Sequence, residues 1–197
     1  MGYESENEAL LYDILNDAFY RSFRNEAYYR NSEATCLELN LTADCNQKCE
    51  YCYLAKRGDE LYPKSIRRPD TILRNIRILF DYLISESMVI RSLDLFSGEI
   101  WGSAFGNDVF DVILTYIDRG LGVKSILIPS NMSFILDTGK YAKVKEYIQK
   151  FKDVNCRLSF SASIDGLYLE ESERSFVAEH ENKKRDQVFY DELFRLC

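Results

Sequence analysis

Residues 36–52, CLELNLTADCNQKCEYC, join two patterns that together decide the fold. In CLELNLT, leucines alternate with polar residues, and a period of two is typical of a β-strand with one apolar and one polar face. The segment that leaves this strand holds Cys45, Cys49 and Cys52 within eight positions. A strand that runs directly into a cluster of thiols predicts a site at the strand's carboxyl end.

The chain beyond this stretch alternates between helical and strand patterns. Apolar residues recur at helical spacing in residues 70–87, 108–122, 139–151 and 185–196, and strand-like runs cover residues 92–96, 125–131 and 157–165. Alternation of this kind predicts parallel strands joined by right-handed crossover helices. We therefore expect an α/β fold with four parallel strands.

The domain organisation follows from the same patterns. The first 30 residues have helical spacing, which predicts an N-terminal helical extension over residues 1–34 and an α/β core over residues 35–197. Residues 56–70, KRGDELYPKSIRRPD, form the one long basic stretch, which we interpret as a solvated loop. A contact between this stretch and an anionic substrate or partner is the alternative.

Polar residues follow one side of two predicted strands. They are Glu38 and Asn40 in the first strand and Ser159, Ser161, Ser163 and Asp165 in the fourth. Parallel strands in an open, doubly wound sheet are usually apolar on both faces. The pattern therefore favours a partial parallel (β/α) barrel whose lumen holds a polar ligand.

Composition narrows the function classes. The 197 residues are 46% hydrophobic and carry a net charge of −7, which argues against a nucleic-acid partner because such a surface needs clustered positive charge. We expect no membrane association, since no apolar run approaches the ~20 residues of a span, and the N-terminus lacks a signal-peptide pattern. We expect a cytoplasmic protein, where the six cysteines serve as metal or catalytic thiolates rather than disulfides.

The three clustered cysteines lack a fourth protein ligand in the sequence. A structural zinc site usually has four, but Cys36 begins the first strand, roughly 20 Å from the cluster loop, and Cys156 begins the fourth strand. His180 is the only histidine, and Cys197 is terminal. Three thiolates without a fourth ligand suit a four-iron cluster with one iron open to a non-protein ligand.

At this point the residues resemble a known family. The run Cys45-Asn46-Gln47-Lys48-Cys49-Glu50-Tyr51-Cys52 looks like the CxxxCxΦC motif of radical S-adenosylmethionine (SAM) enzymes. The resemblance implies that the three cysteines bind a [4Fe–4S] cluster. It also implies that Tyr51, the aromatic residue before the last cysteine, packs near the adenine of SAM.

Further stretches extend the resemblance over about residues 35–170. FSGE, residues 96–99, resembles the family's GGE motif for the methionine amino group, with Ser97 in place of the first glycine. PSN, residues 129–131, occupies the place of a TNG-like turn, and SASIDG, residues 161–166, resembles the S-x-D-G stretch of relatives that carry a SPASM domain. The cofactor-binding residues implied in this way are Tyr51, Ser97, Gly98, Glu99, Asn131, Ser161, Ser163 and Asp165.

Ligands of parallel α/β folds lie at the carboxyl ends of the strands. The candidate residues follow such ends, so we expect the sulfurs of Cys45, Cys49 and Cys52 to converge there. We also expect Glu99 and the inward serines, Ser161 and Ser163, to face the cavity above them.

The resemblance implies an enzyme that binds a [4Fe–4S] cluster and SAM. The reduced cluster cleaves SAM to a 5′-deoxyadenosyl radical, which abstracts hydrogen from a substrate, with a peptide or protein side chain as the leading candidate. An electron donor, flavodoxin- or ferredoxin-like, is the implied partner. The alternatives are a zinc or iron–sulfur binding module without SAM chemistry and a non-catalytic scaffold derived from the same core.

The number of strands leads to a last expectation. The family's partial barrel has six strands, whereas the sequence patterns predict four, and the fourth then has an unpaired edge. We expect either a longer natural chain, of which this is the N-terminal part, or a partner that covers the edge.

Overall fold

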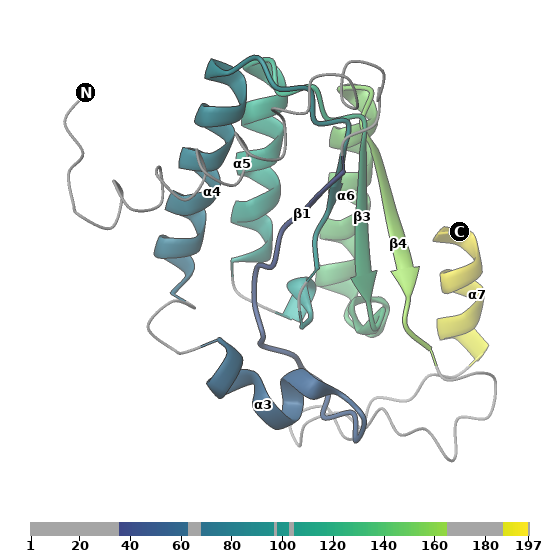
Figure 1. Ribbon diagram of the computed structural model, residues 1–197. Helices are drawn as coiled ribbons and strands as arrows, with labels where there is room; N and C mark the ends of the chain where they lie inside the picture. Colours follow the sequence, from purple (N-terminus) through teal and green to yellow (C-terminus); the bar gives the residue numbers. More distant parts are fainter. Residues whose placement is uncertain (1–35, 63–67, 97, 103–104, 165–186, 197) are drawn as a thin grey trace. The chain divides into compact units, whose positions relative to one another are not determined.

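A computed structural model describes residues 36–62, 68–96, 98–102, 105–164 and 187–196 of the chain (Figure 1). All of them belong to one of the chain's two units, residues 36–197. The predicted helical extension, residues 1–34, lies outside the described residues, and the domain division stays a prediction.

Four parallel strands form a single sheet in the order β1-β2-β3-β4, as the sequence predicts. They are β1 (Cys36–Glu38), β2 (Ser92–Asp94), β3 (Ser125–Ser130) and β4 (Arg157–Ala162). The pairing of β1 with β2 continues beyond the regular ladder, because the N–H of Leu39 donates to Asp94 O and that of Leu41 donates to Phe96 O. The alternating pattern therefore extends to the segment that carries the cysteines.

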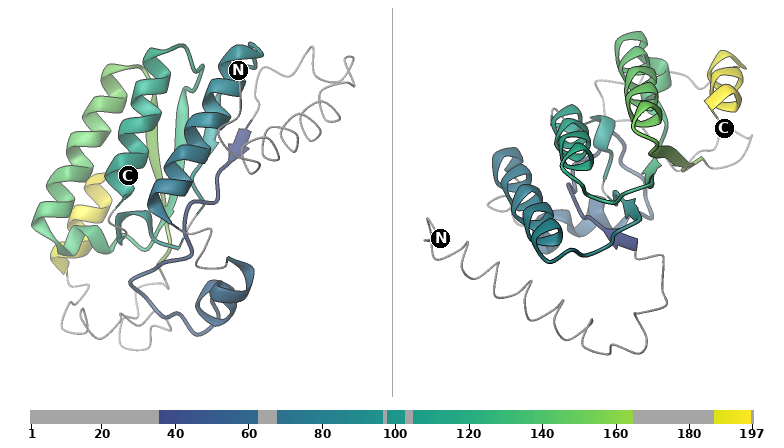
Figure 2. Two further views of the ribbon diagram at one scale, coloured as in Figure 1. Left: turned by 90° about the vertical axis from the view of Figure 1, so that its left-hand side faces the viewer. Right: turned by 90° about the horizontal axis from the view of Figure 1, so that it is seen from above.

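The crossover helices α4 (Pro69–Ser85), α5 (Gly106–Asp118) and α6 (Thr138–Asp153) lie side by side on one face of the sheet (Figure 2). This arrangement follows from the strand order, because successive right-handed crossovers between sequential neighbours return on the same side. A doubly wound sheet needs a reversal of strand order to place helices on both faces. The fold is thus α/β with a four-stranded parallel sheet and helices, consistent with a partial β/α fold.

The two faces of the sheet differ in burial. On the helix-covered face, Leu93, Ile126 and Ile128 are fully buried. On the other face, Glu38 and Ser161 are exposed. The sequence pattern therefore describes a sheet with one apolar and one polar face.

The same turn ends all three crossover helices. After α5, Gly120 adopts a φ of 104° and the N–H of Leu121 donates to Tyr116 O. Ser87 after α4 and Asn155 after α6 take the equivalent left-handed position, with φ values of 54° and 55°. In each case two backbone N–H groups satisfy carbonyls of the last helical turn, which is the Schellman motif.

One prediction about local structure is wrong. Residues 56–61 belong to a helix, α3 (Tyr53–Leu61), and not to the solvated loop that the charges of residues 56–70 suggested. The reason is that Leu54 buries its side chain while Arg57 and Glu60 pair on the exposed side, one helical turn apart. Residues 63–67 lie outside the described residues.

Three further elements complete the described chain: the 3₁₀ turns η1 (Ile100–Gly102) and η2 (Ser133–Leu136), and the helix α7 (Gln187–Leu196). Trp101 of η1 stacks on Phe110 of α5 with ring centroids 4.6 Å apart, so η1 is fixed to the helical layer. Within the described residues, no helix has the length and apolar character needed to cross a membrane.

Candidate functional site

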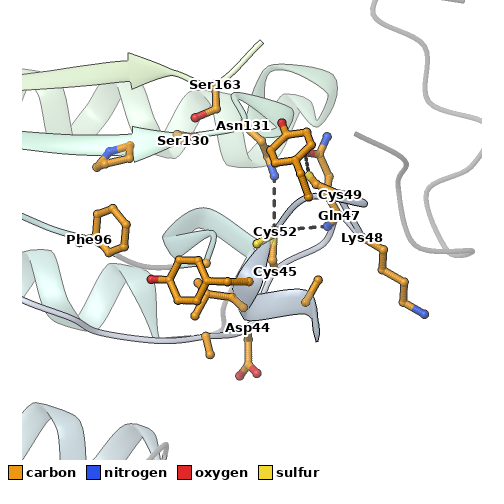
Figure 3. Close-up of a pocket in the computed structure, with 17 residues that line it drawn as sticks. Asp44, Cys45, Gln47, Lys48, Cys49, Cys52, Phe96, Ser130, Asn131 and Ser163 are labelled. Atoms are coloured by element: carbon orange, nitrogen blue, oxygen red, sulfur yellow. Dashed lines mark hydrogen bonds between the residues drawn. The ribbon is translucent and has the colours of Figure 1, made fainter. Parts of the chain in front are cut away.

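A cavity of about 590 Å³ lies where the parallel strands end (Figure 3). Its walls come from the loop after β1, the start of α3 and the ends of β2, β3 and β4. The lining residues are Ala43, Asp44, Cys45, Gln47, Lys48, Cys49, Tyr51, Cys52, Tyr53, Leu54, Ala55, Phe96, Gly98, Pro129, Ser130, Asn131 and Ser163. All three clustered cysteines therefore open onto one cavity at the edge of the sheet where the sequence predicts a site.

The end of β2 fixes the loop that carries the cysteines. The N–H of Gly98 donates to Thr42 O over 2.7 Å, and the N–H of Glu99 donates to Asp44 O over 2.8 Å. A Cβ atom at position 98 would lie 2.2 Å from Asp44 O, so only glycine permits this approach. Gly98 thus sets the distance between β2 and the loop that begins at Cys45.

An amide network fixes the other side of the same loop. Asn131 donates through Nδ2 to Asn46 Oδ1 over 2.8 Å, and Asn46 donates through its own Nδ2 to Ser133 Oγ over 2.8 Å. Asn131 Nδ2 also lies 3.8 Å from the Cys45 sulfur (Figure 3). The side-chain oxygen Oδ1 of Asn131 accepts the N–H of Ser133 over 2.9 Å, which closes the turn after β3. The cysteine loop and the end of β3 are therefore held as one unit.

Glu99 is fully buried beneath this network. Its carboxylate accepts the Asn131 N–H over 2.7 Å and the Ser130 hydroxyl over 3.0 Å, with a longer bond of 3.4 Å from the Trp101 N–H. Burial raises the pKa of Glu99 to about 7, although these hydrogen bonds oppose the shift. The expectation that Glu99 faces the cavity is therefore not met in this structure, because its carboxylate is turned to the backbone and hydroxyl groups that shape the wall.

The three cysteines share the cavity without forming a ready-made metal site. Among the described residues, no three His, Cys, Asp or Glu side chains are gathered closely enough to hold a metal ion. The thiol of Cys49 instead donates to Gln47 Oε1 over 3.8 Å, and the Cys45 sulfur accepts the Gln47 N–H over 3.4 Å (Figure 3). Burial, followed by the nearby Glu99, Cys49 and Cys52, raises the pKa of Cys45 to about 11. Cys45 is therefore placed as a protonated thiol, and a metal ion would have to displace its proton to bind the sulfur.

The remaining described cysteines lie elsewhere, as the sequence predicts. Cys36 pairs with Ser92 at the first position of the sheet, and Cys156 immediately precedes β4, which starts at the same level. Both are therefore at the amino end of the sheet, opposite the cavity. Neither can supply a fourth ligand to the clustered cysteines.

The structure separates the other predicted cofactor residues into three groups. Tyr51, Gly98, Asn131 and Ser163 line the cavity. Glu99 is buried behind its wall, while Ser161 is exposed on β4 and is absent from the residues that line the cavity. Ser97 and Asp165 lie outside the described residues.

Several residues of the site escaped the sequence prediction. Gln47 and Asn46 stand between the cysteines of the motif, Phe96 begins FSGE and Ser130 belongs to PSN. The sequence does not reveal the partners of Asn46 and Ser130, because their bonds join segments about 30 to 90 positions apart. Contacts over such separations leave no periodic signal in the sequence.

The cavity fits an iron–sulfur cluster in its donor chemistry. Three cysteine sulfurs, the ligands that iron–sulfur clusters use, come from one loop of eight residues. Gly98 keeps the opposite wall free of a side chain, and Gln47 offers a buried N–H donor that lacks a partner. The chain matches no family model, no curated protein and no solved structure with which it was compared.

Proposed function

We propose that this protein is a radical SAM enzyme that binds a [4Fe–4S] cluster and SAM in the cavity at the carboxyl end of the sheet. The observation that carries the proposal is that Cys45, Cys49 and Cys52 all open onto this one cavity, together with Gly98 and Asn131 from two other strand ends. A packed structural loop would have no need to direct three thiols into a shared space. The motif spacing and the cavity thus support the same chemistry.

In this proposal Cys45, Cys49 and Cys52 would hold the cluster, and the iron without a cysteine would be open to the amino and carboxylate groups of SAM. When bound there and reduced, such a cluster would supply the electron for cleavage of SAM to methionine and a 5′-deoxyadenosyl radical, which would abstract a hydrogen atom from the substrate. The protein contributes orientation and the exclusion of water. Leu54 and Phe96, in the wall around the cysteines, give the cavity apolar surface for that purpose.

The remaining lining residues have roles that match the parts of SAM. Tyr51 and Phe96 offer aromatic faces for the adenine, and Ser163 offers a hydroxyl for the ribose. Gly98 lets the methionine end approach the backbone. Glu99 is the proposed partner of the SAM ammonium, as the resemblance implies. To serve in that way its buried carboxylate must give up a present bond to Ser130 or Asn131 and turn toward the cavity.

The polar face of the sheet supports the finer proposal of a partial barrel. Glu38 and Ser161 are exposed on the face that the crossover helices leave open, where a barrel has its lumen. We propose that this face, continuous with the cavity, receives the substrate, with a peptide or protein side chain as the leading class. We propose a cytoplasmic enzyme that receives electrons from a flavodoxin- or ferredoxin-like donor.

Anaerobic reconstitution with iron and sulfide, followed by reduction and addition of SAM, tests the proposal. We expect about four irons per chain and formation of 5′-deoxyadenosine. Cys45→Ala should abolish both, whereas the matched variant Cys36→Ala, at the opposite end of the sheet, should retain both. A loss that is equal in the two variants would refute the assignment of the site.

The same experiment distinguishes a radical SAM enzyme from the alternative, a metal-binding module or scaffold. A metal-binding module or scaffold would load metal through Cys45, Cys49 and Cys52 but would not cleave SAM under any reducing condition. Zinc content measured on protein purified without iron supplementation distinguishes a zinc module from an iron–sulfur module.

A further inference from the structure

Gln47 is the feature of the cavity that the proposed ligands leave unexplained. It stands between Cys45 and Cys49, lines the cavity and is only 4% exposed. Among the described residues it is one of three with a buried side-chain nitrogen or oxygen that has no hydrogen-bond partner; the others are Trp101 and Tyr190. A buried N–H without an acceptor pays the cost of losing its bonds to water, so its presence in the cavity wall indicates an acceptor that binds there.

The thiol of Cys49, which now donates to the carboxamide oxygen of Gln47, indicates which atom that acceptor is. The carboxamide oxygen accepts a hydrogen bond from the Cys49 thiol over 3.8 Å, while Nε2 of the same carboxamide points to no acceptor. A cysteine that ligates a metal does so as a thiolate, which has no proton to donate and accepts hydrogen bonds instead. The bond seen here is therefore incompatible with Cys49 as a ligand.

A half turn of the carboxamide resolves both problems. Because the amide oxygen and nitrogen occupy nearly equivalent positions, the turn places Nε2–H where the oxygen now faces the Cys49 sulfur. The oxygen then takes the place of the unpartnered nitrogen, and a buried carbonyl oxygen without a partner is tolerated more readily than a buried N–H. No movement of the backbone is required, and the Gln47 N–H keeps its bond to the Cys45 sulfur.

We propose that Gln47 is a positioning residue of the cluster site, whose side-chain N–H donates to the Cys49 sulfur when that sulfur ligates iron, and that this bond raises the reduction potential of the cluster. The inference rests on the proposed function. Its physical basis is that hydrogen bonds to ligating sulfurs stabilise the reduced cluster, which carries one more negative charge. Gln47 would thereby help the cluster to accept the electron from its donor.

The first test compares Gln47→Leu with Gln149→Leu after anaerobic reconstitution. Leucine keeps most of the side-chain volume and removes the donor, and Gln149 is a glutamine on the exposed side of α6, where it bonds only within that helix, to Asp153. We expect a lower midpoint potential in Gln47→Leu, measured by a redox titration followed by electron paramagnetic resonance, and an unchanged value in Gln149→Leu. Equal midpoints in Gln47→Leu and the unaltered protein would overturn the inference.

A second test needs no variant and remains decisive if Gln47→Leu does not load a cluster. The chain has three glutamines, and the other two, Gln149 and Gln187, lie on α6 and α7. In protein labelled with ¹⁵N at the glutamine side-chain amide, pulsed electron paramagnetic resonance of the reduced cluster should detect a ¹⁵N coupling. Absence of that coupling in a loaded cluster would overturn the inference.

Failure of the proposed function has a different signature. If the unaltered protein shows no [4Fe–4S] signal after reconstitution, the radical SAM proposal is wrong and the inference falls with it. If the cluster forms and neither the midpoint nor the ¹⁵N spectrum involves Gln47, the radical SAM proposal stands and only the role of Gln47 is refuted.

Discussion

The two ends of the sheet are built by different means. At the amino end, α4, α5 and α6 each stop in the same backbone motif, in which only Ser87, Gly120 and Asn155 take a special conformation. At the carboxyl end, the chain is held by particular side chains, above all Glu99 and Asn131. A backbone motif can be formed by many different residue types, whereas a side-chain network is broken when any one of its residues is replaced. The difference indicates that one end serves folding and the other serves a site.

The largest effect that should follow from this contrast is that of Gly98→Ala. The added Cβ would lie 2.2 Å from Asp44 O, a backbone atom, so β2 and the cysteine loop must move apart. We expect a loss of about 3 kcal/mol in the free energy of unfolding, measured with urea.

Gly58→Ala is the matched control for this change. A Cβ atom at Gly58 would lie 3.6 Å from the Cβ of Ala43, an ordinary contact, and the position is inside α3. Alanine should therefore stabilise the protein by about 0.5–1 kcal/mol. Equal effects of the two substitutions would show that the missing side chain at Gly98 does not set the distance between β2 and the cysteine loop.

The second prediction concerns pH. Burial raises the pKa of Glu99 to about 7 in the folded chain, above its ordinary value of 4.5, so the folded state holds an additional proton between these values. The contribution of Glu99 to the free energy of unfolding should therefore be fully present below about pH 4.5. It should decline by about 3 kcal/mol as the pH rises from there through 7.

Glu99→Gln isolates this contribution, because every other titrating group is common to both proteins. Free energies of unfolding measured at several values between pH 4.5 and 8 should decline less steeply in Glu99→Gln than in the unaltered protein. Parallel pH profiles of the two proteins would show that folding does not raise the pKa of Glu99.

At the amino end, Gly120→Ala should cost about 1 kcal/mol. A Cβ there meets nothing within 4 Å, so the cost comes only from the left-handed backbone, with a φ of 104°. Urea unfolding measures the loss, and iron content after reconstitution should equal that of the unaltered protein. A large loss of iron would contradict the independence of the two ends.

The smallest expected effect is a gain in stability, from Ser87→Gly. Ser87 is exposed and holds a φ of 54°, which glycine adopts without steric cost. Because glycine also has more freedom to lose on folding, we expect Ser87→Gly to stabilise the protein by only about 0.5 kcal/mol. Destabilisation in the same urea assay would mean that the serine side chain makes a contribution that outweighs its backbone strain.

The predictions from sequence succeeded where the signal is periodic. The four strands and the helices α4, α5, α6 and α7 fall where the apolar spacing puts them. The helix α3 was missed because its charged residues resemble a solvated loop, although Leu54 gives it a buried side. Ser161 was expected in the site because it lies on the polar side of β4, yet of the two serines the cavity reaches only Ser163, which lies just past the end of the strand at Ala162.

The sequence by itself determined that Cys45, Cys49 and Cys52 share one end of the sheet, while Cys36 and Cys156 lie at the other. Parallel strands all point the same way, so a residue's position before or after a strand is enough to assign its end. Only the tertiary structure decided that Glu99 is turned away from the cavity and that Gln47 carries an unpartnered N–H beside Cys49. The orientation of a side chain depends on acceptors and donors from segments far away in the chain, and these meet only when the strands are assembled.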